Sequence, residues 1–532
     1  MTSAEESLQL TTRDGWTAGH NPWSIALVAT IATFMEVLDT SIANVSLPHI
    51  AGNLSVSTDE STWVLTSYLV SNAIVLPISG WLSTRFGRKR FYMTCVALFT
   101  ISSFLCGIAP NLGLLVFFRV LQGIGGGGLA PTEQSILADT FPPRRRGMAF
   151  AVYGMAVVLA PAVGPTLGGF ITDHYSWRWV FFINVPVGLL SMLLSARVLT
   201  DPPHLTAARF KLGGIDTIGL GLIAVGLGAL EIVLDKGQES DWFASNSIVL
   251  FTVIAAVALT AFVVWEWRHE HPVVEVRLFK NGNFAVANVL MLVLGMILFG
   301  STVLLPQFTQ ILMGWSAQDA GLALSPGGMT VMLCMPAVGF LVSRVDTRYL
   351  IAFGFGVSAI ALYHMARTLH PGIDFSTAMW LRIYQASGLA FLFVPINALV
   401  FNGVPPNKNN AVSGIVNLSR NMGGDVGIAL VTTLIARRAQ VHQANLTAHI
   451  PAGDPTLAAR LAQATAALQH AGLASAQAGK AALGLVYRQV LQQAATLAYL
   501  DVLVVLAVFA GLMVPLVLMT RKTQPGKAAM AH

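Results

Sequence analysis

The chain has 532 residues, of which 55% are hydrophobic and only 11% are charged, and its mean hydropathy is +0.66. This composition excludes an ordinary water-soluble domain and predicts a chain embedded in a lipid bilayer. The 31 Lys and Arg residues outnumber the 25 Asp and Glu residues, and we attribute the formal charge of +6 to membrane topology and not to affinity for nucleic acid.

Apolar runs of similar length recur along the whole chain. A helix needs about 20 apolar residues to cross a bilayer. Fourteen such runs predict an all-α integral membrane protein with fourteen spans. In chain order the runs are 24–45, 61–82, 91–109, 113–135, 148–172, 179–199, 214–234, 247–267, 284–306, 318–342, 349–369, 377–400, 411–436 and 495–519.

The runs divide as six, two and six, which predicts two six-helix bundles and an inserted helix pair. A stretch rich in Ala, Gln and Leu before the last span predicts helices outside the membrane, either an interaction surface or a mobile loop. The predicted parts are a cytoplasmic tail at 1–23, an N-terminal bundle at 24–200, the inserted pair at 201–275, a C-terminal bundle at 276–520 with a periplasmic loop at 441–493, and a second cytoplasmic tail at 521–532.

Charges in the loops predict the side of the membrane that each loop faces. No cleavable signal peptide precedes the first span, because residues 1–22 are polar, so we expect the N-terminus in the cytoplasm. An even number of spans returns the C-terminus to the same side. Basic residues gather in the loops expected inside, as the positive-inside rule requires. They are Arg85, Arg88, Lys89, Arg90, Arg144, Arg145, Arg146, Arg197, Arg209, Lys211, Arg268, Arg277, Lys280, Arg344, Arg348 and Lys408.

Two acidic residues lie inside the first predicted span, where a charge is costly unless it has a function. Glu36 and Asp39 are three residues apart, so they share one face of a helix, and their span contains no basic residue. A partner must therefore come from another helix. Asp39 and Arg119 both lie about 9 Å below the predicted outer surface at 1.5 Å per residue. We predict that they pair, either as a permanent structural ion pair or as part of a proton pathway.

Glu133 follows Arg119 by fourteen residues, which places it on nearly the same helix face and closer to the cytoplasm. A carboxyl group in such a position can gain or lose a proton when a conformational change moves Arg119. We therefore predict Asp39, Glu36 and Glu133 as proton-binding residues and Arg119 as the electrostatic switch. A helix cap or a packing interface is the alternative for Glu133.

The fifth predicted span is unusually rich in Gly and Pro. Glycines let two helix backbones approach closely, and prolines bend a helix by removing hydrogen bonds. Such a helix suits an interface that opens and closes, although close packing without movement is also possible. The residues are Gly154, Pro161, Gly164, Pro165, Gly168 and Gly169.

The second half of the chain repeats one motif of the first half. Arg119, Gln122 and Gly123 in span four correspond to Arg382, Gln385 and Gly388 in span twelve, which indicates a duplicated half. Other charges in or near spans predict structural pairing or interface positions, namely Arg420, Asp425 and Asp501. Glu231 and Asp235, at the predicted outer end of span seven, are expected to be solvated.

A substrate cavity between the bundles would need an adaptable wall of apolar, aromatic and polar side chains. Such residues are also common in the core or facing lipid. The candidates are Phe34, Met35, Asn44, Trp63, Tyr68, Gln122, Met296, Phe299, Arg382 and Gln385.

Motifs for enzymes, metals and nucleotides do not fit this chain. Cys95, Cys106 and Cys334 fall inside spans without the spacing of metal ligands. The glycines from 123 to 128 match a dinucleotide-binding pattern, but they lie in an apolar helix with no preceding strand. Since no phosphate-binding loop or hydrolase motif occurs, we expect no cofactor, and an ion gradient must supply the energy.

Four segments, in order, resemble motifs of the major facilitator superfamily, and specifically its fourteen-span drug:proton antiporters of the EmrB/QacA type. They are 38–48 (Leu-Asp-Thr-Ser-Ile-Ala-Asn-Val-Ser-Leu-Pro), 80–89 (Gly-Trp-Leu-Ser-Thr-Arg-Phe-Gly-Arg-Lys), 119–123 (Arg-Val-Leu-Gln-Gly) and 154–169. The resemblance implies proton or substrate handling by Asp39, proton coupling by Arg119, and gating by Gly80, Arg85, Gly87, Arg88 and the glycines and prolines of span five. Thr84 departs from the family pattern, which has an acidic residue there.

The long loop before the last span and Asp241-Trp-Phe243 are most similar to the EmrB branch. That resemblance implies a bacterial inner-membrane protein that works with a periplasmic adaptor and an outer-membrane channel. It implies export of hydrophobic or amphipathic compounds in exchange for protons. A dedicated exporter of one metabolite, such as a fatty acid, siderophore or antibiotic, is the alternative, and a non-transporting receptor or scaffold is a further one.

Overall fold

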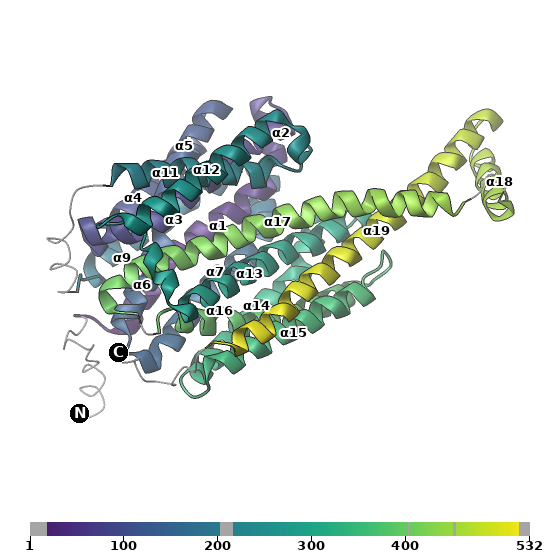
Figure 1. The fold of residues 1–532 in the computed structure, drawn as a ribbon. Helices are drawn as coiled ribbons and strands as arrows, with labels where there is room; N and C mark the ends of the chain where they lie inside the picture. The colour runs from purple at the N-terminus through teal and green to yellow at the C-terminus, as the bar shows by residue number, and fades with distance from the viewer. Residues whose placement is uncertain (1–18, 203–215, 403, 451–453, 521–532) are drawn as a thin grey trace.

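The computed structural model describes residues 19–202, 216–402, 404–450 and 454–520, and all regular secondary structure in these ranges is helical. Most of the two predicted tails, and Arg209 and Lys211 of the predicted loop, lie outside the described residues. The helices form one long bundle, from which a helical hairpin projects at one end (Figure 1). At the opposite end α1 begins and α19 finishes.

The first half starts with capped and proline-initiated helices. The Asn21 side chain accepts a hydrogen bond from the Trp23 N–H, and Pro22 takes the first helical position, where its missing N–H costs nothing. The predicted fourth span is divided in two near Gly127. The helices are α1 (Pro22–Leu54), α2 (Thr58–Ser61), α3 (Trp63–Phe86), α4 (Arg88–Gly107), α5 (Leu112–Gly126), α6 (Leu129–Thr140), α7 (Pro143–His174), α8 (Trp179–Phe182) and α9 (Asn184–Val198).

The inserted pair and the second half follow. They comprise α11 (Thr217–Lys236), η1 (Trp242–Ala244), α12 (Asn246–Arg268), η2 (Val276–Lys280), α13 (Gly282–Gln307), η3 (Phe308–Leu312), α14 (Ala317–Val342), α15 (Thr347–Thr368), α16 (Phe375–Val400), η4 (Pro406–Lys408), α17 (Asn409–Ala448), α18 (Pro455–His470) and α19 (Ser475–Leu518).

Twelve helices of the described chain are long and apolar enough to cross a membrane, and α7 makes thirteen if its two parts count as one span. Those parts, Pro143–Pro161 and Val163–His174, meet at an angle of 43° beside Pro161. The predicted span 411–436 lies in α17, which is too polar to be counted by composition. It packs between α3, α13 and α19. The count of fourteen spans therefore stays a prediction.

The two halves pair their helices alike. In the first half α1 packs on α7, α4 on α5 and α4 on α9; in the second half α13 packs on α17, α15 on α16 and α15 on α19. The halves meet along two helix pairs, α7 with α14 and α3 with α17. This matches the duplication indicated by the two Arg-x-x-Gln motifs. The inserted helix α11 packs on α3 and also reaches α17, so it contacts both halves.

Glycines allow the backbones of the two halves to touch. A Cβ atom at Gly147 of α7 would lie 2.7 Å from the carbonyl oxygen of Gly339 of α14. A Cβ atom at Gly80 of α3 would lie 2.5 Å from the carbonyl oxygen of Asn410 of α17. Both distances are far below van der Waals contact, so a larger residue at either position separates the halves.

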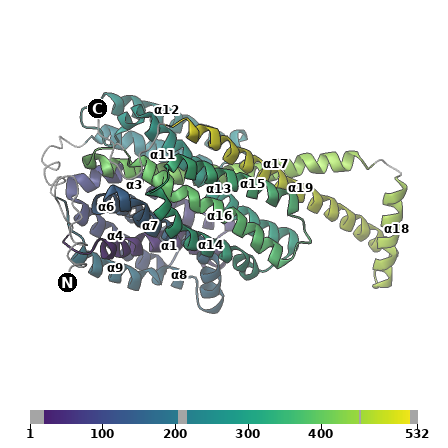
Figure 2. The same cartoon turned by 90° about the horizontal axis from the view of Figure 1, so that it is seen from below.

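The predicted loop 441–493 is helical. It consists of the last residues of α17, the short α18 and the first residues of α19, which together project beyond the bundle (Figure 2). No residue of α18 is buried. At the base of the hairpin, Asp501 of α19 pairs with Arg438 and His442 of α17, at 2.6 and 2.8 Å. The structural pairing predicted for Asp501 is therefore confirmed.

We predict that Gly80→Val destabilises this conformation, because the added methyl groups would collide with the Asn410 backbone. Overpacking of this kind costs about 1 to 3 kcal/mol. The measurement is the thermal midpoint of the purified protein, together with thiol labelling of a Ser413→Cys reporter, which is buried between the halves. Gly356→Val is the control, since nothing lies within 4 Å of a Cβ there. Equal midpoints and labelling for the two variants would contradict the prediction.

Candidate ion-coupling site

The predicted pair between span one and span four is present. Arg119 Nη1 of α5 lies 2.6 Å from Asp39 Oδ2 of α1, and both side chains are fully buried. Matching the depths of the two residues thus identified the correct partner.

Two amides complete the surroundings of Asp39. Gln122 Nε2 and Asn184 Nδ2 donate to Asp39 Oδ1 at 3.0 and 2.6 Å. Both carboxyl oxygens therefore accept hydrogen bonds from groups that only donate, and the site fits the carboxylate form. Sequence reasoning assigned Gln122 to a substrate cavity and missed Asn184, whose only signal is an amide inside an apolar run.

Arg119 is held by three helices. Its Nε donates to the Val64 carbonyl of α3 at 2.9 Å, and its Nη1 also donates to Gln122 Oε1 at 2.9 Å. The Tyr68 ring lies under the guanidinium, with its centroid 4.3 Å away, a cation–π contact. Nη2 of Arg119 is buried and has no hydrogen-bond partner among the described residues.

Tyr68 joins this pair to the second acidic residue. The Tyr68 hydroxyl and Asn72 Nδ2 each donate to Glu36 Oε1 at 3.2 Å. Glu36 is 8% exposed and lies about one turn from Asp39 on α1. Tyr68, predicted in the cavity wall, is therefore buried between the guanidinium and Glu36.

Glu133 lies further along the same side of the bundle. Thr30 of α1 donates to its Oε1 at 2.6 Å, while its Oε2 is buried without a hydrogen-bond partner among the described residues. Asp39 forms an ion pair with Arg119. In the described part of the chain, no basic side chain forms an ion pair with Glu133 or Glu36. The positions of Asp39, Glu36 and Thr30 spread the three carboxyl groups over about 14 Å of α1 at 1.5 Å per residue.

Arg88, a predicted gating residue, lies at the end of the bundle where α4 begins. Its Nη2 is 2.6 Å from Asp139 Oδ2 of α6 and 2.8 Å from Asn410 Oδ1 of α17. Asn409 Nδ2 donates to Asp139 Oδ1 at 2.6 Å. Asn410 Nδ2 donates to the Thr84 hydroxyl at 3.0 Å, so Thr84 accepts a hydrogen bond from the other half.

The backbone requires glycine between α3 and α4. Gly87 has a φ of 90°, in the left-handed region that disfavours other residues. This turn aims Arg88 into the bundle. Asp139 was missed in the sequence because it follows the predicted end of span four and reads as a loop acid.

Neutral polar groups continue the contact between the halves. Ser135 and Ser413 hydroxyls are 2.6 Å apart, and Gln134 Nε2 donates to Asn397 Oδ1 at 3.0 Å. All four side chains are at most 1% exposed. This end of the bundle is therefore closed.

The span-five residues divide by what they touch. A Cβ at Gly154 would lie 2.9 Å from Met335 of the other half, whereas a Cβ at Gly164 would lie 2.3 Å from the Ser41 hydroxyl of α1. A Cβ at Gly168 would lie 3.0 Å from Ile42 of α1, and Gly169 has nothing within 4 Å. Gly164 and Gly168 therefore allow α7 to pack against α1 beside Asp39. The bend in α7 lies at Pro161.

Arg420 and Asp425 occupy the pairing or interface positions predicted for them, whereas the expectation for Glu231 is wrong. Arg420 Nη1 donates to Tyr153 Oη of the first half at 2.8 Å. Asp425 contacts Glu231 of α11. Glu231 is 1% exposed and not solvated, because α11 packs its inner face on α17.

The ten cavity candidates do not converge on one surface. Trp63 and Asn44 are exposed, and Phe34 and Phe299 are half-buried. The other six are buried: Met35, Tyr68, Gln122, Met296, Arg382 and Gln385.

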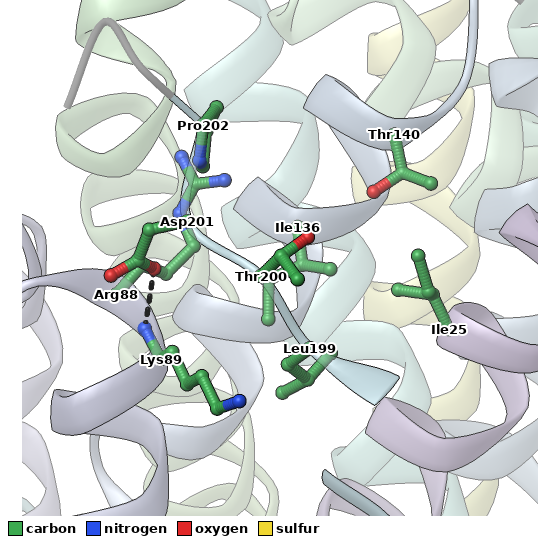
Figure 3. A pocket seen from close by; sticks show the side chains of 9 residues that line it. All are labelled: Ile25, Arg88, Lys89, Ile136, Thr140, Leu199, Thr200, Asp201 and Pro202. Atoms are coloured by element: carbon green, nitrogen blue, oxygen red, sulfur yellow. Dashed lines mark hydrogen bonds between the residues drawn. The ribbon is translucent and has the colours of Figure 1, made fainter. Parts of the chain in front are cut away.

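A small cavity of about 10 Å³ lies at the closed end (Figure 3). Beside it, the Lys89 N–H donates to Asp201 Oδ1 at 2.7 Å. This volume corresponds to roughly one water molecule, which is far too small for an organic substrate. The cavity is lined by Ile25, Arg88, Lys89, Ile136, Thr140, Leu199, Thr200, Asp201 and Pro202.

Two like halves of membrane-spanning helices, with buried charges and a closed end between them, define a secondary transporter. The chain belongs to the Major Facilitator Superfamily, whose sequence model matches residues 29–428.

Two relatives and one solved structure illustrate the similarity. The Multidrug export protein EmrB of Escherichia coli (strain K12) is 39% identical over 439 residues, covering 82% of this chain and 85% of the relative. The Fatty acid resistance protein FarB of Neisseria gonorrhoeae is 38% identical over 442 residues, covering 82% and 86%. A structure of the proton:xylose symporter XylE has a TM-score of 0.58 at 16% identity and covers 95% of this chain and 97% of its own.

We predict that Arg88→Ala opens the closed end, because it removes the buried ion pair with Asp139 and the hydrogen bond to Asn410 of the second half. Breaking a buried ion pair costs about 3 to 5 kcal/mol. The measurement is labelling of the buried Ser413→Cys reporter, which should become faster. Arg90→Ala is the matched control, since Arg90 is exposed on the same helix. Labelling that stays slow in Arg88→Ala would show that the ion pair does not hold this end closed.

Proposed function

We propose that this protein is a proton-coupled antiporter that exports hydrophobic or amphipathic compounds across a bacterial inner membrane by alternating access, with both termini in the cytoplasm. The observation that carries the proposal is the fully buried pair of Asp39 and Arg119, with its oxygens at hydrogen-bonding distance from Gln122 and Asn184. Intramembrane charges of this kind mark ion pathways in transporters.

Proton uptake by Asp39 would change the forces on α5. A protonated carboxyl group loses its charge, so Arg119 would lose its counter-charge and keep the Val64 carbonyl, Gln122 and the Tyr68 and Phe181 rings as partners. An unmatched buried cation is costly, so the helices that carry these groups would move to a new arrangement. Glu36 and Glu133 are proposed as further proton positions on the way to the closed end, because neither forms an ion pair among the described residues.

The movement would reach the rest of the bundle through α7. Gly164 and Gly168 bring α7 into contact with α1 close to Asp39, and Gly154 faces the other half. A shift of α1 would therefore press directly on a bent helix at the contact with α14. The halves would then rock about the α7–α14 and α3–α17 pairs, opening the end closed by Arg88.

The substrate class is proposed from the relatives. One is named for multidrug export and another for fatty acid resistance. The second favours an alternative proposal, in which the protein exports one dedicated metabolite such as a fatty acid, siderophore or antibiotic. A panel of chemically unrelated dyes and drugs separates the two, because activity confined to one compound excludes multidrug export.

We further propose that the hairpin of α17, α18 and α19 binds a periplasmic adaptor, which would connect the protein to an outer-membrane channel. The hairpin projects from the end opposite to the closed one (Figure 2). Its exposed apolar side chains include Leu483, Leu485 and Tyr487, at 58%, 45% and 48% exposure, and apolar groups exposed together favour protein contact.

We predict that Asp39→Asn and Arg119→Ala each reduce gradient-driven dye transport to background, because each leaves a buried group without its partner and removes the switch. The assay is ethidium transport into or out of proteoliposomes under an imposed pH gradient.

Asp173→Asn is the matched control for that assay, since Asp173 is an exposed acidic residue near the end of α7. Ethidium transport that ignores the pH gradient would disprove antiport. Gradient-driven transport that survives both changes would exclude this pair as the coupling site. No gradient-driven transport by the natural chain is the result expected of a receptor or scaffold that does not transport.

A further inference from the structure

Arg382 is a buried arginine of the second half whose hydrogen-bond partners are neutral side chains. Arg382 of α16 is 5% exposed. Its Nη1 donates to Gln385 Oε1 at 2.5 Å and its Nη2 to the Thr302 hydroxyl at 3.1 Å, while its Nε is buried without a partner among the described residues. In the part of the chain that the structure describes, Arg382 forms no ion pair.

This arrangement mirrors the site in the first half. Arg119 lies seven residues after the start of α5 at 112, and Arg382 lies seven residues after the start of α16 at 375. Each arginine donates to a glutamine three residues further along its helix.

The group that accepts the hydrogen bond of the glutamine amide differs between the two halves. Gln122 donates its amide to Asp39 of α1, and Gln385 donates its amide to the Ser301 hydroxyl of α13. Ser301 therefore corresponds to Asp39 as the acceptor of the glutamine amide, and the second half has the arginine of this arrangement but a neutral hydroxyl in place of the carboxylate.

A guanidinium without a counter-charge is unfavourable inside a membrane protein. Hydroxyl and amide oxygens supply partial charges, but they do not neutralise a full positive charge. The guanidinium also has an unused donor at Nε. An anion that enters this position from outside would therefore gain both charge compensation and hydrogen bonds.

We propose that Arg382, with Thr302, Ser301 and Gln385, binds the anionic head group of an amphipathic substrate. The proposal rests on the transport function proposed above and specifies one substrate class for it. Ser301 presents a neutral hydroxyl to Gln385, where Asp39 presents a carboxylate to Gln122 in the first half. Phe299 lies one turn from Thr302 on α13 and is half-buried. Its ring would contact the apolar part of the amphipathic substrate.

The test compares two dyes that differ by one anionic group. Anilinonaphthalene sulfonate carries a sulfonate, and N-phenyl-naphthylamine has nearly the same rings without it. Both are followed in proteoliposomes under an imposed pH gradient, with ethidium as a cationic reference. The measured quantity is the ratio of the sulfonate rate to the neutral-dye rate.

We predict that Arg382→Gln and Ser301→Asp each lower this ratio about tenfold or more, the worth of a charge-assisted hydrogen bond. Ser301→Asp is the sharper variant, because it keeps the arginine and supplies a resident carboxylate, as Asp39 does for Arg119. Arg382→Lys should keep a larger ratio than Arg382→Gln. Arg367→Gln, an exposed arginine of α15, is the matched control. In the natural chain, octanesulfonate should inhibit sulfonate transport more strongly than octyltrimethylammonium does, a comparison that needs no variant.

An unchanged ratio in Ser301→Asp and Arg382→Gln, or equal loss of both dyes, would overturn the proposal and indicate a structural role. Rates that fall for all dyes when gluconate replaces chloride, or when phosphatidylglycerol is left out of the vesicles, would assign the site to an inorganic anion or a lipid and also overturn it. If the natural chain moves no dye under the gradient, ethidium included, the transport function itself fails, which separates the two proposals.

Discussion

A charge inside a bundle of apolar helices must be matched by a partner on another helix, and this constraint organises the first half of the molecule. The Asp39 carboxylate of α1 receives Arg119 and Gln122 from the α5 side and Asn184 from α9. Arg119 in turn reaches the α3 backbone at Val64. One ion pair therefore fixes four helices relative to one another. A change in the charge of Asp39 acts on all four together.

The contact between the halves is built differently, because it consists mainly of neutral groups. The charged pair of Arg88 and Asp139 lies wholly within the first half, and the second half contributes the amides of Asn409 and Asn410 to it. Neutral hydrogen bonds contribute only about 0.5 to 1.5 kcal/mol each to stability. Separation of the halves therefore leaves the ion pair of Arg88 and Asp139 intact, although Arg420 loses its hydrogen bond to Tyr153. At Gly147 and Gly80 the backbones of the two halves touch directly. These contacts stabilise the closed state without side chains that would have to repack when the halves separate.

Much of this architecture follows from the sequence, and the failures have physical causes. Depth matching found the pair of Asp39 and Arg119, because 1.5 Å per residue is a reliable ruler within straight spans. It could not find Asp139, because the apolar run ends at residue 135 although helix α6 continues to Thr140. Hydropathy likewise does not identify α17 as a span, because the polar residues of α17 face other helices and not lipid. Glu231 was expected in solvent because a single sequence does not show that α11 packs on α17.

The two halves differ in the residue opposite the Arg-x-x-Gln pair, and this difference indicates which ligand each half binds during alternating access. Duplication supplied both halves with an Arg-x-x-Gln pair, but Asp39 stands opposite one pair and Ser301 opposite the other. If the first half carries its own anion, a proton is the ligand that changes its charge. If the second half lacks an anion, a substrate head group is the ligand that completes it. Because α1 and α13 are matching helices of the two bundles, each ligand would act on the same element of its own half, and the shared helix pairs would convert the two events into one movement.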